Sequence, residues 1–390
     1  MSRFLLAWEL GGAFGHLGAL RALALPLRER GHDVTLALSD CRQAETLFAG
    51  FTVLEAPIRG ANPSAIAEPS TYADLLSNAG WGDKERLGEL VGHWREVFDR
   101  AAPDIVVGNY APTALLAAQG RRFPTVVFGT GFYSPPDTEE LPDLCPWRDN
   151  YPDRLRLTER TVLETANRQL ESQSVPPLAR LTELYCRAAA SLLTTYPEMD
   201  HYPDRTGGHY IGPWGELPGI TPDWPPGDGP RVFAYLKRME ALPYVLAHLR
   251  EKRWPTLVYA PEATDIATKF ASRTLHVVDS PLDIREVAAG CSFAVLNAGH
   301  NATLRLLLAC KPVLALPLNG EQQLVTRNVE RLGAGLGIRP TQPVKAVACL
   351  NRLESDPTYA EAAQAFGSRY AETDQHQREA RVVAQLESRA

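Results

Sequence analysis

The chain has 390 residues, of which 45% are hydrophobic and 22% charged, and its formal net charge is −6. This length predicts two domains, or three, and the ordinary composition excludes global disorder. The mild acidity argues against a nucleic-acid-binding surface, because no basic stripe is available to neutralise phosphates. No apolar run approaches the roughly 20 residues of a membrane helix. The N-terminus makes a poor secretory signal, and the scattered cysteines contain no C-x-x-C pair, so we expect a cytoplasmic protein with reduced thiols.

Short apolar runs alternate with helical patterns through the first half of the chain. The predicted strands cover residues 4–10, 34–39, 51–56, 105–108, 125–128 and 191–195, and the predicted helices cover 17–30, 84–100 and 154–171. Pro26 falls inside the first helix and predicts a kink or a split there. Strands that alternate with helices indicate a parallel sheet with right-handed crossovers.

A second alternating series follows a stretch at 207–230, in which roughly half of the residues are glycine or proline. Such a stretch favours neither helix nor strand, so we interpret it as an interdomain linker. Beyond it, the predicted strands are 232–236, 256–260, 275–278, 293–296 and 313–316, and the predicted helices are 242–252, 266–271, 284–289, 301–309 and 322–332. Residues 359–390 predict one or two surface helices.

The pattern therefore predicts an α/β protein with two doubly wound parallel sheets. We expect a first domain at 1–208, a linker at 209–230 and a second domain at 231–375. A C-terminal helix is expected at 376–390, and one alternative is that it packs back toward the first domain.

The most informative turn lies between a predicted strand that ends at Asn297 and a helix that begins near Asn301. Gly299 provides the tight turn between them. A helix N-terminus after such a turn presents unpaired N–H groups and the positive end of the helix dipole, which form an anion pocket, most often for phosphate. The pocket is expected at the carboxyl edge of the sheet, where open α/β folds bind ligands. The alternative is an ordinary turn followed by an ordinary helix cap.

The wider segment NAGHNATLRLLLACKPVLALPLNGEQ resembles the nucleotide-sugar signature of the UDP-glycosyltransferase-like family, the plant and macrolide-type enzymes. The residues that fit are Gly299, Asn301, Thr303, Pro312, Pro317, Leu318, Glu321, Gln322, Asn328, Gly333, Ala334 and Gly335. The resemblance implies the GT-B fold, in which two Rossmann-like domains face each other across a cleft. It also implies metal-independent, inverting transfer from a UDP- or dTDP-sugar donor to a small-molecule acceptor, with no further cofactor.

The donor is expected in the C-terminal half. The family's acidic-Gln pair binds donor-sugar hydroxyls and corresponds to Glu321 and Gln322, although both residues could merely open a helix. The family's phosphate-binding His is replaced here by Asn297, and Lys237 or Arg238 could supply the missing charge, unless they are simply a solvated pair. The expected donor-binding set is Lys237, Arg238, Val278, Asn297, Gly299, His300, Asn301, Ala302, Thr303, Glu321 and Gln322. Val278 marks the stretch that recognises the base, which leaves UDP versus dTDP open.

The first strand runs into a glycine-rich turn before a helix. Its glycines, at 11, 12, 15 and 18, do not satisfy G-x-G-x-x-G, which disfavours a dinucleotide-dependent dehydrogenase. Instead, Gly15 and His16 match the family's Gly-His, which implies that His16 is the general base, because imidazole titrates near neutrality. A packing or capping histidine is the alternative.

The aspartate that holds this imidazole in many relatives corresponds to Asn109. An amide orients the ring but cannot offset its positive charge. The replacement of this aspartate by Asn109 leaves three interpretations. The pair of His16 and Asn109 is a weaker base, the acceptor is more acidic than an alcohol, such as a phenol, or another carboxylate such as Glu9 substitutes for the aspartate.

Aromatic residues near the N-terminal strand ends suit a planar or apolar acceptor, although each could equally belong to the core. The expected acceptor-binding residues are Trp8, Phe14, Trp81, Phe132 and Tyr133. The sequence contains no H-E-x-x-H, no G-x-S-x-G and no Walker loop, so we expect no metal site. A monomer or a homodimer is expected.

Three other functions remain open. Asn109 and Asn297 favour a non-catalytic homologue that acts as a helper or binding subunit. A sugar-nucleotide epimerase or hydrolase of the same fold would act on the donor alone. Transfer to a lipid carrier is disfavoured, because no basic and apolar docking face is evident.

Overall fold

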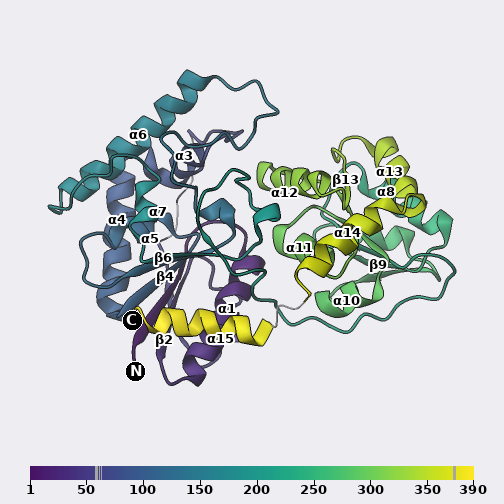
Figure 1. Cartoon of the computed structure of the whole chain (residues 1–390), viewed down its shortest axis with the longest axis horizontal. Coiled ribbons are helices and arrows are strands. Elements are labelled where there is room, and N and C mark those ends of the chain that lie inside the picture. Colours follow the sequence, from purple (N-terminus) through teal and green to yellow (C-terminus); the bar gives the residue numbers. More distant parts are fainter. Residues whose placement is uncertain (58–59, 61, 63, 372–374) are drawn as a thin grey trace. The chain divides into compact units, whose positions relative to one another are not determined.

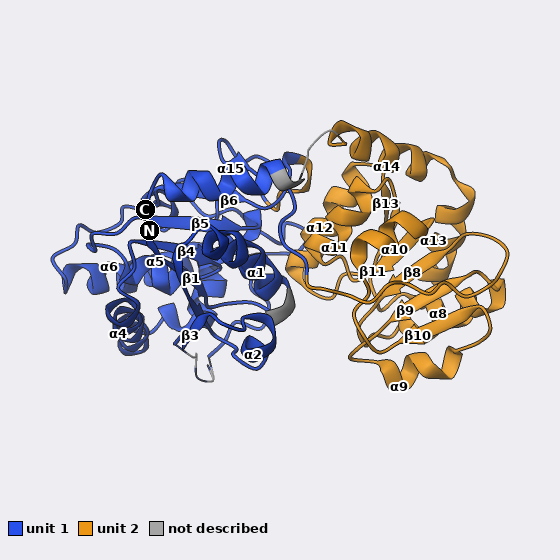
Figure 2. Ribbon diagram, turned by 90° about the horizontal axis from the view of Figure 1, so that it is seen from below, with its two compact units in different colours: residues 1–197, 202–216, 374–390 blue, residues 198–201, 217–373 orange. Residues whose placement is uncertain are grey.

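The chain was analysed as a computed structural model, which describes residues 1–57, 60, 62, 64–371 and 375–390. The side chains of residues 13, 14, 375 and 376 also lie outside the description. The chain divides into two compact units (Figure 2). The first unit comprises Met1–Pro197, Tyr202–Glu216 and Asp374–Ala390, and the second comprises Glu198–His201 and Leu217–Thr373.

The described part of the first unit holds a seven-stranded parallel sheet with the strand order β3-β2-β1-β4-β5-β6-β7. Its strands are β1 (Arg3–Trp8), β2 (Asp33–Leu38), β3 (Thr52–Glu55), β4 (Ile105–Asn109), β5 (Thr125–Gly129), β6 (Ala190–Leu193) and β7 (His209–Tyr210). Its α-helices are α1 (Ala13–Glu29), α2 (Ala44–Leu47), α3 (Tyr72–Leu76), α4 (Lys84–Ala101), α5 (Pro112–Ala117), α6 (Pro152–Glu171), α7 (Glu183–Cys186) and α15 (Gln375–Glu387). The strand order reverses between β1 and β4, which is the topological switch point of this sheet.

Two helices from opposite ends of the chain, α1 and α15, share a core cluster with the strands of this sheet (Figure 1). Helix α1 continues through Pro26 to Glu29, so the predicted split does not occur. Helix α15 buries Val382, Val383 and Leu386 in the cluster. One face of α15 therefore belongs to the core of the first unit.

The described part of the second unit holds a six-stranded parallel sheet with the order β10-β9-β8-β11-β12-β13. Its strands are β8 (Val232–Tyr235), β9 (Thr256–Tyr259), β10 (Leu275–Val278), β11 (Phe293–Leu296), β12 (Val313–Ala315) and β13 (Gly335–Gly337). Its α-helices are α8 (Leu242–Lys252), α9 (Thr264–Ala267), α10 (Ile284–Gly290), α11 (His300–Leu308), α12 (Gly320–Arg331), α13 (Pro343–Ser355) and α14 (Thr358–Arg369). The switch point lies between β8 and β11, and α8 and α13 pack into the core cluster of this sheet.

The glycine- and proline-rich stretch does contain extended pairing, contrary to the prediction. Strand β7 pairs in parallel with β6, and Ile220 forms an isolated parallel bridge with Leu282. The sequence also did not reveal β13. A Cβ on Gly335 would lie 2.0 Å from the Val313 carbonyl oxygen, so this edge strand requires a glycine that weakens its strand signal.

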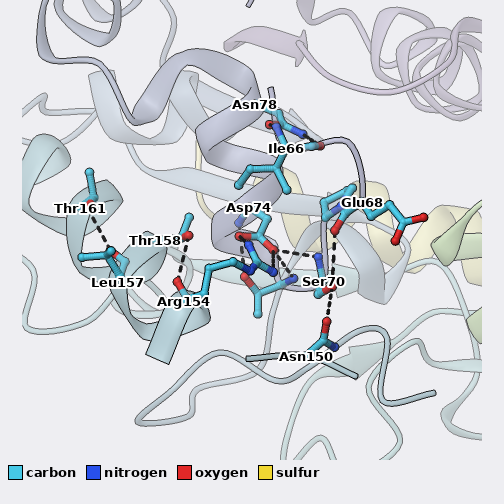
Figure 3. Close-up of polar contacts among 12 residues, drawn as sticks. Ile66, Glu68, Ser70, Asp74, Asn78, Asn150, Arg154, Leu157, Thr158 and Thr161 are labelled. Atoms are coloured by element: carbon cyan, nitrogen blue, oxygen red, sulfur yellow. Dashed lines mark hydrogen bonds and ion pairs between the residues drawn. The ribbon is translucent and has the colours of Figure 1, made fainter. Parts of the chain in front are cut away.

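Helix α3 in the first unit is held by a buried acidic side chain (Figure 3). Asp74 is 0% exposed and accepts hydrogen bonds from Arg154 Nη1 at 3.1 Å and Nη2 at 3.2 Å. It also accepts from the backbone N–H of Ser70 at 2.8 Å and of Thr71 at 3.3 Å. Four donors therefore satisfy this carboxylate, which ties α3 to α6.

Arg154→Met should lower the free energy of unfolding by about 2 kcal/mol, because it leaves Asp74 buried without its cation. Urea unfolding measures this change. Arg156 is the matched control on the same helix: it pairs with Glu140, and both side chains are more than half exposed. Arg156→Met should change stability by less than about 1 kcal/mol, as expected of a surface ion pair. Equal effects from the two substitutions would contradict the assigned role of Asp74.

Among the described residues, none of the helices is both long enough and apolar enough to cross a membrane.

Candidate active site

His16 and Asn109 meet at the switch point of the first sheet. His16 lies in the first turn of α1, directly after β1, and Asn109 ends β4, where it pairs in register with Trp8 of β1. His16 Nδ1 lies 2.6 Å from Asn109 Oδ1. The predicted neighbourhood of these two residues is thus present, while the catalytic role of His16 stays a prediction.

The hydrogen bonds of Asn109 determine the tautomer of His16. The Asn109 Nδ2 group donates to the Phe128 carbonyl at 2.8 Å, so Oδ1 faces the imidazole as an acceptor. His16 must then carry its proton on Nδ1 and donate it to Oδ1. In a neutral imidazole this leaves Nε2 with a lone pair. The ring is therefore oriented and prepared to accept a proton at Nε2.

The environment of His16 is aromatic and dry. The residue is 5% exposed, and its ring stacks on Trp8 with a centroid distance of 5.4 Å and an interplanar angle of 14°. The rings of Tyr133 and Tyr110 lie at 5.1 and 6.0 Å. Burial lowers the pKa of His16 to about 4, against a smaller opposing effect of the Asn109 bond. His16 is therefore neutral at physiological pH.

Gly11 leaves space beside the reactive nitrogen. Its φ of +91° lies in the region that favours glycine, and a Cβ there would lie 2.4 Å from His16 Nε2. A side chain at this position would collide with Nε2, so the turn beside the imidazole requires a glycine here.

The pH dependence of stability reports the burial of His16. Its pKa of about 4 lies below the value of about 6.5 for an unfolded chain. Between these values the unfolded state binds more protons, so the free energy of unfolding falls as the pH drops from 6.5 toward 4. Buried His300 acts in the same direction, whereas the raised pKa of Glu321 acts in the opposite one.

We expect His16→Gln to reduce the loss of stability between pH 7 and pH 5 by about 2 kcal/mol. Urea unfolding at the two pH values measures this. His93→Gln is the control, because His93 is exposed on α4, and it should leave the loss unchanged. An unchanged loss in His16→Gln would show that His16 is not held neutral by the fold.

The aromatic residues expected to bind the acceptor occupy different environments. Trp81 is 0% exposed and donates its indole N–H to Thr113 Oγ1 at 3.0 Å, which makes it a core residue rather than a pocket wall. Trp8 is 1% exposed and supports the His16 ring. Phe132 and Tyr133 follow β5, and Tyr133 stacks on Tyr110 at 4.4 Å. Phe14 lies in α1, but its side chain is outside the described residues.

Glu9 does not take the place of the missing aspartate. Its carboxylate accepts from the Thr113 N–H at 2.9 Å and from Thr113 Oγ1 at 2.5 Å, at the N-terminus of α5. Among the described residues, no carboxylate contributes to the pKa shift of His16. Glu9 therefore caps a helix, as an acidic group at a helix N-terminus commonly does.

The switch point of the second sheet carries a small pocket that is open to solvent. Its lining residues are Tyr235, Lys237, Leu296, Asn297, Gly299, Ala302 and Gln322. Five of these belong to the expected donor-binding set, and Tyr235 and Leu296 were not predicted. They are the last residues of β8 and β11, so the rule that ligands bind at carboxyl strand ends could have identified them.

Asn297 connects three segments at the floor of this pocket. Its Oδ1 accepts from the Lys237 N–H at 2.6 Å, and its Nδ2 donates to the Leu316 carbonyl at 2.7 Å. The amide therefore joins the ends of β8 and β12 to β11. Both of its polar atoms thus contact the backbone, while a contact of Asn297 with a phosphate stays a prediction.

The two basic residues after β8 are both paired. Lys237 Nζ lies 2.7 Å from Glu262, and Arg238 Nη2 lies 2.6 Å from Asp265. All four side chains are 42% exposed or more. Lys237 lines the pocket, whereas Arg238 is not among its lining residues. A bound anion would compete with Glu262 for Lys237. We assign Arg238 no contact with a ligand in this pocket.

The start of α11 forms the strand–turn–helix junction that the sequence predicted, while anion binding there stays a prediction. Ala298 has a φ of +54°, and Gly299 is the N-cap, whose position carries no side-chain cap. Thr303 is fully buried, and its Oγ1 has no hydrogen-bond partner among the described residues. Ala302 lines the pocket, Asn301 is half-buried, and His300 is buried with a pKa lowered to about 4. His300 therefore contributes no charge at neutral pH.

Glu321 and Gln322 lie at the start of α12 but make different contacts. Gln322 lines the pocket, and its Oε1 accepts a hydrogen bond from the Leu318 N–H at 2.7 Å. Its backbone N–H donates to Oδ1 of the N-cap residue Asn319 at 3.0 Å. Glu321 Oε1 instead lies 3.8 Å from His201 Nε2, a residue that sequence patterns did not indicate. Burial raises the pKa of Glu321 to about 7, while 32% of its side chain stays exposed. Val278 ends the edge strand β10 and is half-buried.

No cluster of three or more potential metal ligands is present among the described residues.

No protein-family model matches the sequence. A PGL/p-HBAD biosynthesis rhamnosyltransferase of Mycobacterium bovis is 29% identical over 300 residues, which cover 70% of this chain and 65% of that protein. The match thus spans less than two thirds of that relative. A PGL/p-HBAD biosynthesis glycosyltransferase of Mycobacterium tuberculosis is 26% identical over 316 residues, which cover 74% of this chain and 73% of that protein.

Among solved structures, the spinosyn rhamnosyltransferase SpnG matches with a TM-score of 0.72 and 16% identity, over 99% of this chain and 100% of SpnG. Its complex with thymidine diphosphate matches with a TM-score of 0.67 and 16% identity, over 99% of this chain and 100% of that chain. Together with the two parallel sheets, these similarities define an α/β two-domain protein with the GT-B fold, which confirms the predicted fold class. The chain is thus similar in sequence and in fold to glycosyltransferases with the GT-B fold.

Proposed function

We propose that this protein is a nucleotide-sugar-dependent glycosyltransferase that moves a sugar, with inversion, to a small aromatic or apolar acceptor. The observation that carries the proposal is the oriented imidazole: His16 donates from Nδ1 to Asn109 at 2.6 Å, which leaves Nε2 free to accept a proton at the sheet's switch point. A general base needs a defined tautomer and an accessible lone pair. The names of the sequence relatives support sugar transfer as the reaction.

In the proposed reaction, His16 Nε2 takes the proton of the acceptor hydroxyl. The acceptor oxygen forms a bond to the anomeric carbon of the donor, and the bond from that carbon to the diphosphate oxygen breaks. The diphosphate leaves with the electron pair, and its charge is stabilised by the N–H groups at the start of α11 and by Lys237. Attack and departure on opposite faces invert the anomeric configuration.

We favour dTDP over UDP as the nucleotide, and a deoxyhexose such as rhamnose as the sugar. Two relatives of this chain are named as rhamnosyltransferases, and one of them, SpnG, has been solved with thymidine diphosphate. Gln322, which lines the pocket, would hydrogen-bond the sugar through its amide, while Glu321 faces His201.

Calorimetric titration with dTDP and with UDP tests the donor half of this proposal. We expect dTDP to bind with the lower Kd. Binding of neither nucleotide would contradict the proposal and favour the non-catalytic helper. Consumption of a dTDP-sugar without any acceptor, followed by NMR, would instead favour an epimerase or hydrolase.

A further inference from the structure

The strength of a histidine as a general base depends on how well its surroundings stabilise the positive charge of the protonated ring. The Nδ1–H group of His16 meets an amide oxygen, Asn109 Oδ1, at 2.6 Å. Asn109 is in turn fixed by its bond to the Phe128 carbonyl. An amide carries no net charge, so this partner orients the imidazole but offsets little of the positive charge that follows protonation.

Within the part of the chain that the structure describes, the other groups around His16 do not supply that charge. From β1, Trp8 stacks on the ring, and the neighbouring Glu9 carboxylate is bonded to Thr113. Tyr110 follows β4, and Tyr133 comes from the segment after β5; both place aromatic rings beside the imidazole. The faces of the aromatic rings attract a protonated imidazole. Burial outweighs this attraction and lowers the pKa of His16 to about 4. His16 is thus a well-oriented but weak base.

A weak base transfers a proton efficiently only from an acid that ionises readily. The pKa of an aliphatic hydroxyl lies near that of water, far above the pKa of a phenol, which is about 10, as for the tyrosine side chain. The pKa gap between the acceptor hydroxyl and His16 is therefore smaller by about five or six pK units for a phenol than for an aliphatic hydroxyl. The rings of Tyr110 and Tyr133, which stack on each other at 4.4 Å, also make the surroundings of the imidazole aromatic, which suits a phenol.

We propose that the hydroxyl glycosylated by this protein is phenolic, an inference that rests on the proposed glycosyltransferase function. The phenol proton passes to His16 Nε2, and the phenolate oxygen bonds to the anomeric carbon. The bond from that carbon to the diphosphate breaks, and the nucleoside diphosphate leaves with the electron pair.

A single acceptor with both kinds of hydroxyl tests this directly. 4-Hydroxybenzyl alcohol carries a phenolic and an aliphatic hydroxyl on one ring, so both compete on the same scaffold. With dTDP-rhamnose, we expect at least about 100-fold more product on the phenolic oxygen, assigned by NMR. Product mainly on the benzylic oxygen would overturn the inference but leave the proposed function intact. Failure of dTDP to bind in calorimetry would instead remove the proposed function.

Asn109→Asp tests the physical cause. A carboxylate beside Nδ1 stabilises the charged imidazole and strengthens the base, so the share of benzylic product should rise at least tenfold relative to the wild type. An unchanged ratio in a folded variant would overturn the role of the amide. Because the new carboxylate also faces the Phe128 carbonyl, thermal unfolding must accompany this comparison. If the variant does not fold, the wild-type product ratio decides the matter alone.

Discussion

We expect His16→Ala to lower kcat for sugar transfer by about 100- to 10,000-fold, while the Kd for dTDP stays unchanged. The reason is that the substitution removes Nε2, the atom that takes the acceptor proton. The residues that line the candidate donor pocket all lie in the second unit, whereas His16 lies in the first. Kinetics with saturating donor, together with calorimetry, measure the two quantities separately.

His93→Ala is the matched control for this prediction, because His93 is an exposed histidine of the same unit and should leave kcat unchanged. If His16 acts as the base, the activity of His16→Ala should also recover as the pH rises toward the pKa of the acceptor, because the acceptor then ionises without help. Unchanged turnover in His16→Ala, or no recovery at high pH, would remove the assignment.

Gly299→Asp should have opposite effects on stability and on donor binding. Gly299 is the N-cap of α11 with a φ of −62°, and a Cβ there meets no atom within 4 Å. Asp is a favoured N-cap residue, so the variant should be as stable as the wild type or up to about 1 kcal/mol more stable. The same carboxylate would enter the pocket and repel a diphosphate, so we expect the Kd for dTDP to rise by at least about 100-fold.

Two alanine variants separate charge from volume in this prediction. Gly299→Ala adds only a methyl group to the pocket and should weaken dTDP binding less than Gly299→Asp does. Gly92→Ala adds a methyl group to the exposed surface of α4, where a Cβ also meets nothing within 4 Å, and should leave binding unchanged. Normal dTDP binding by a folded Gly299→Asp variant would show that the diphosphate does not occupy the start of α11.

Much of the fold could be predicted, because buried parallel strands and amphipathic helices leave strong periodic patterns. Strands β10 and β11 occur at the predicted residues, as does helix α8. The glycine-containing β13 and the short β7 were missed, since their pairing depends on neighbours that are distant in sequence. The position of α15 in the first unit is a tertiary property, which the sequence offered only as one alternative for the C-terminal helix.

Those residues of the candidate sites that belong to short sequence motifs could be predicted from the sequence. The Gly15-His16 pair and the turn at Gly299 mark both switch points in the sequence. The role of Asn297 as a backbone connector was not predictable, because it depends on the Lys237 N–H and the Leu316 carbonyl. The contact of Glu321 with His201 was missed for the same reason, since the two residues are 120 positions apart.

The transfer reaction itself tests the central claim most directly. Purified protein, dTDP-rhamnose and 4-hydroxybenzyl alcohol are followed by NMR at the anomeric proton of the sugar. We predict that the donor signal decays only when the acceptor is present and that a glycoside of the opposite anomeric configuration replaces it. Retention of configuration, or donor loss without acceptor, would contradict the account.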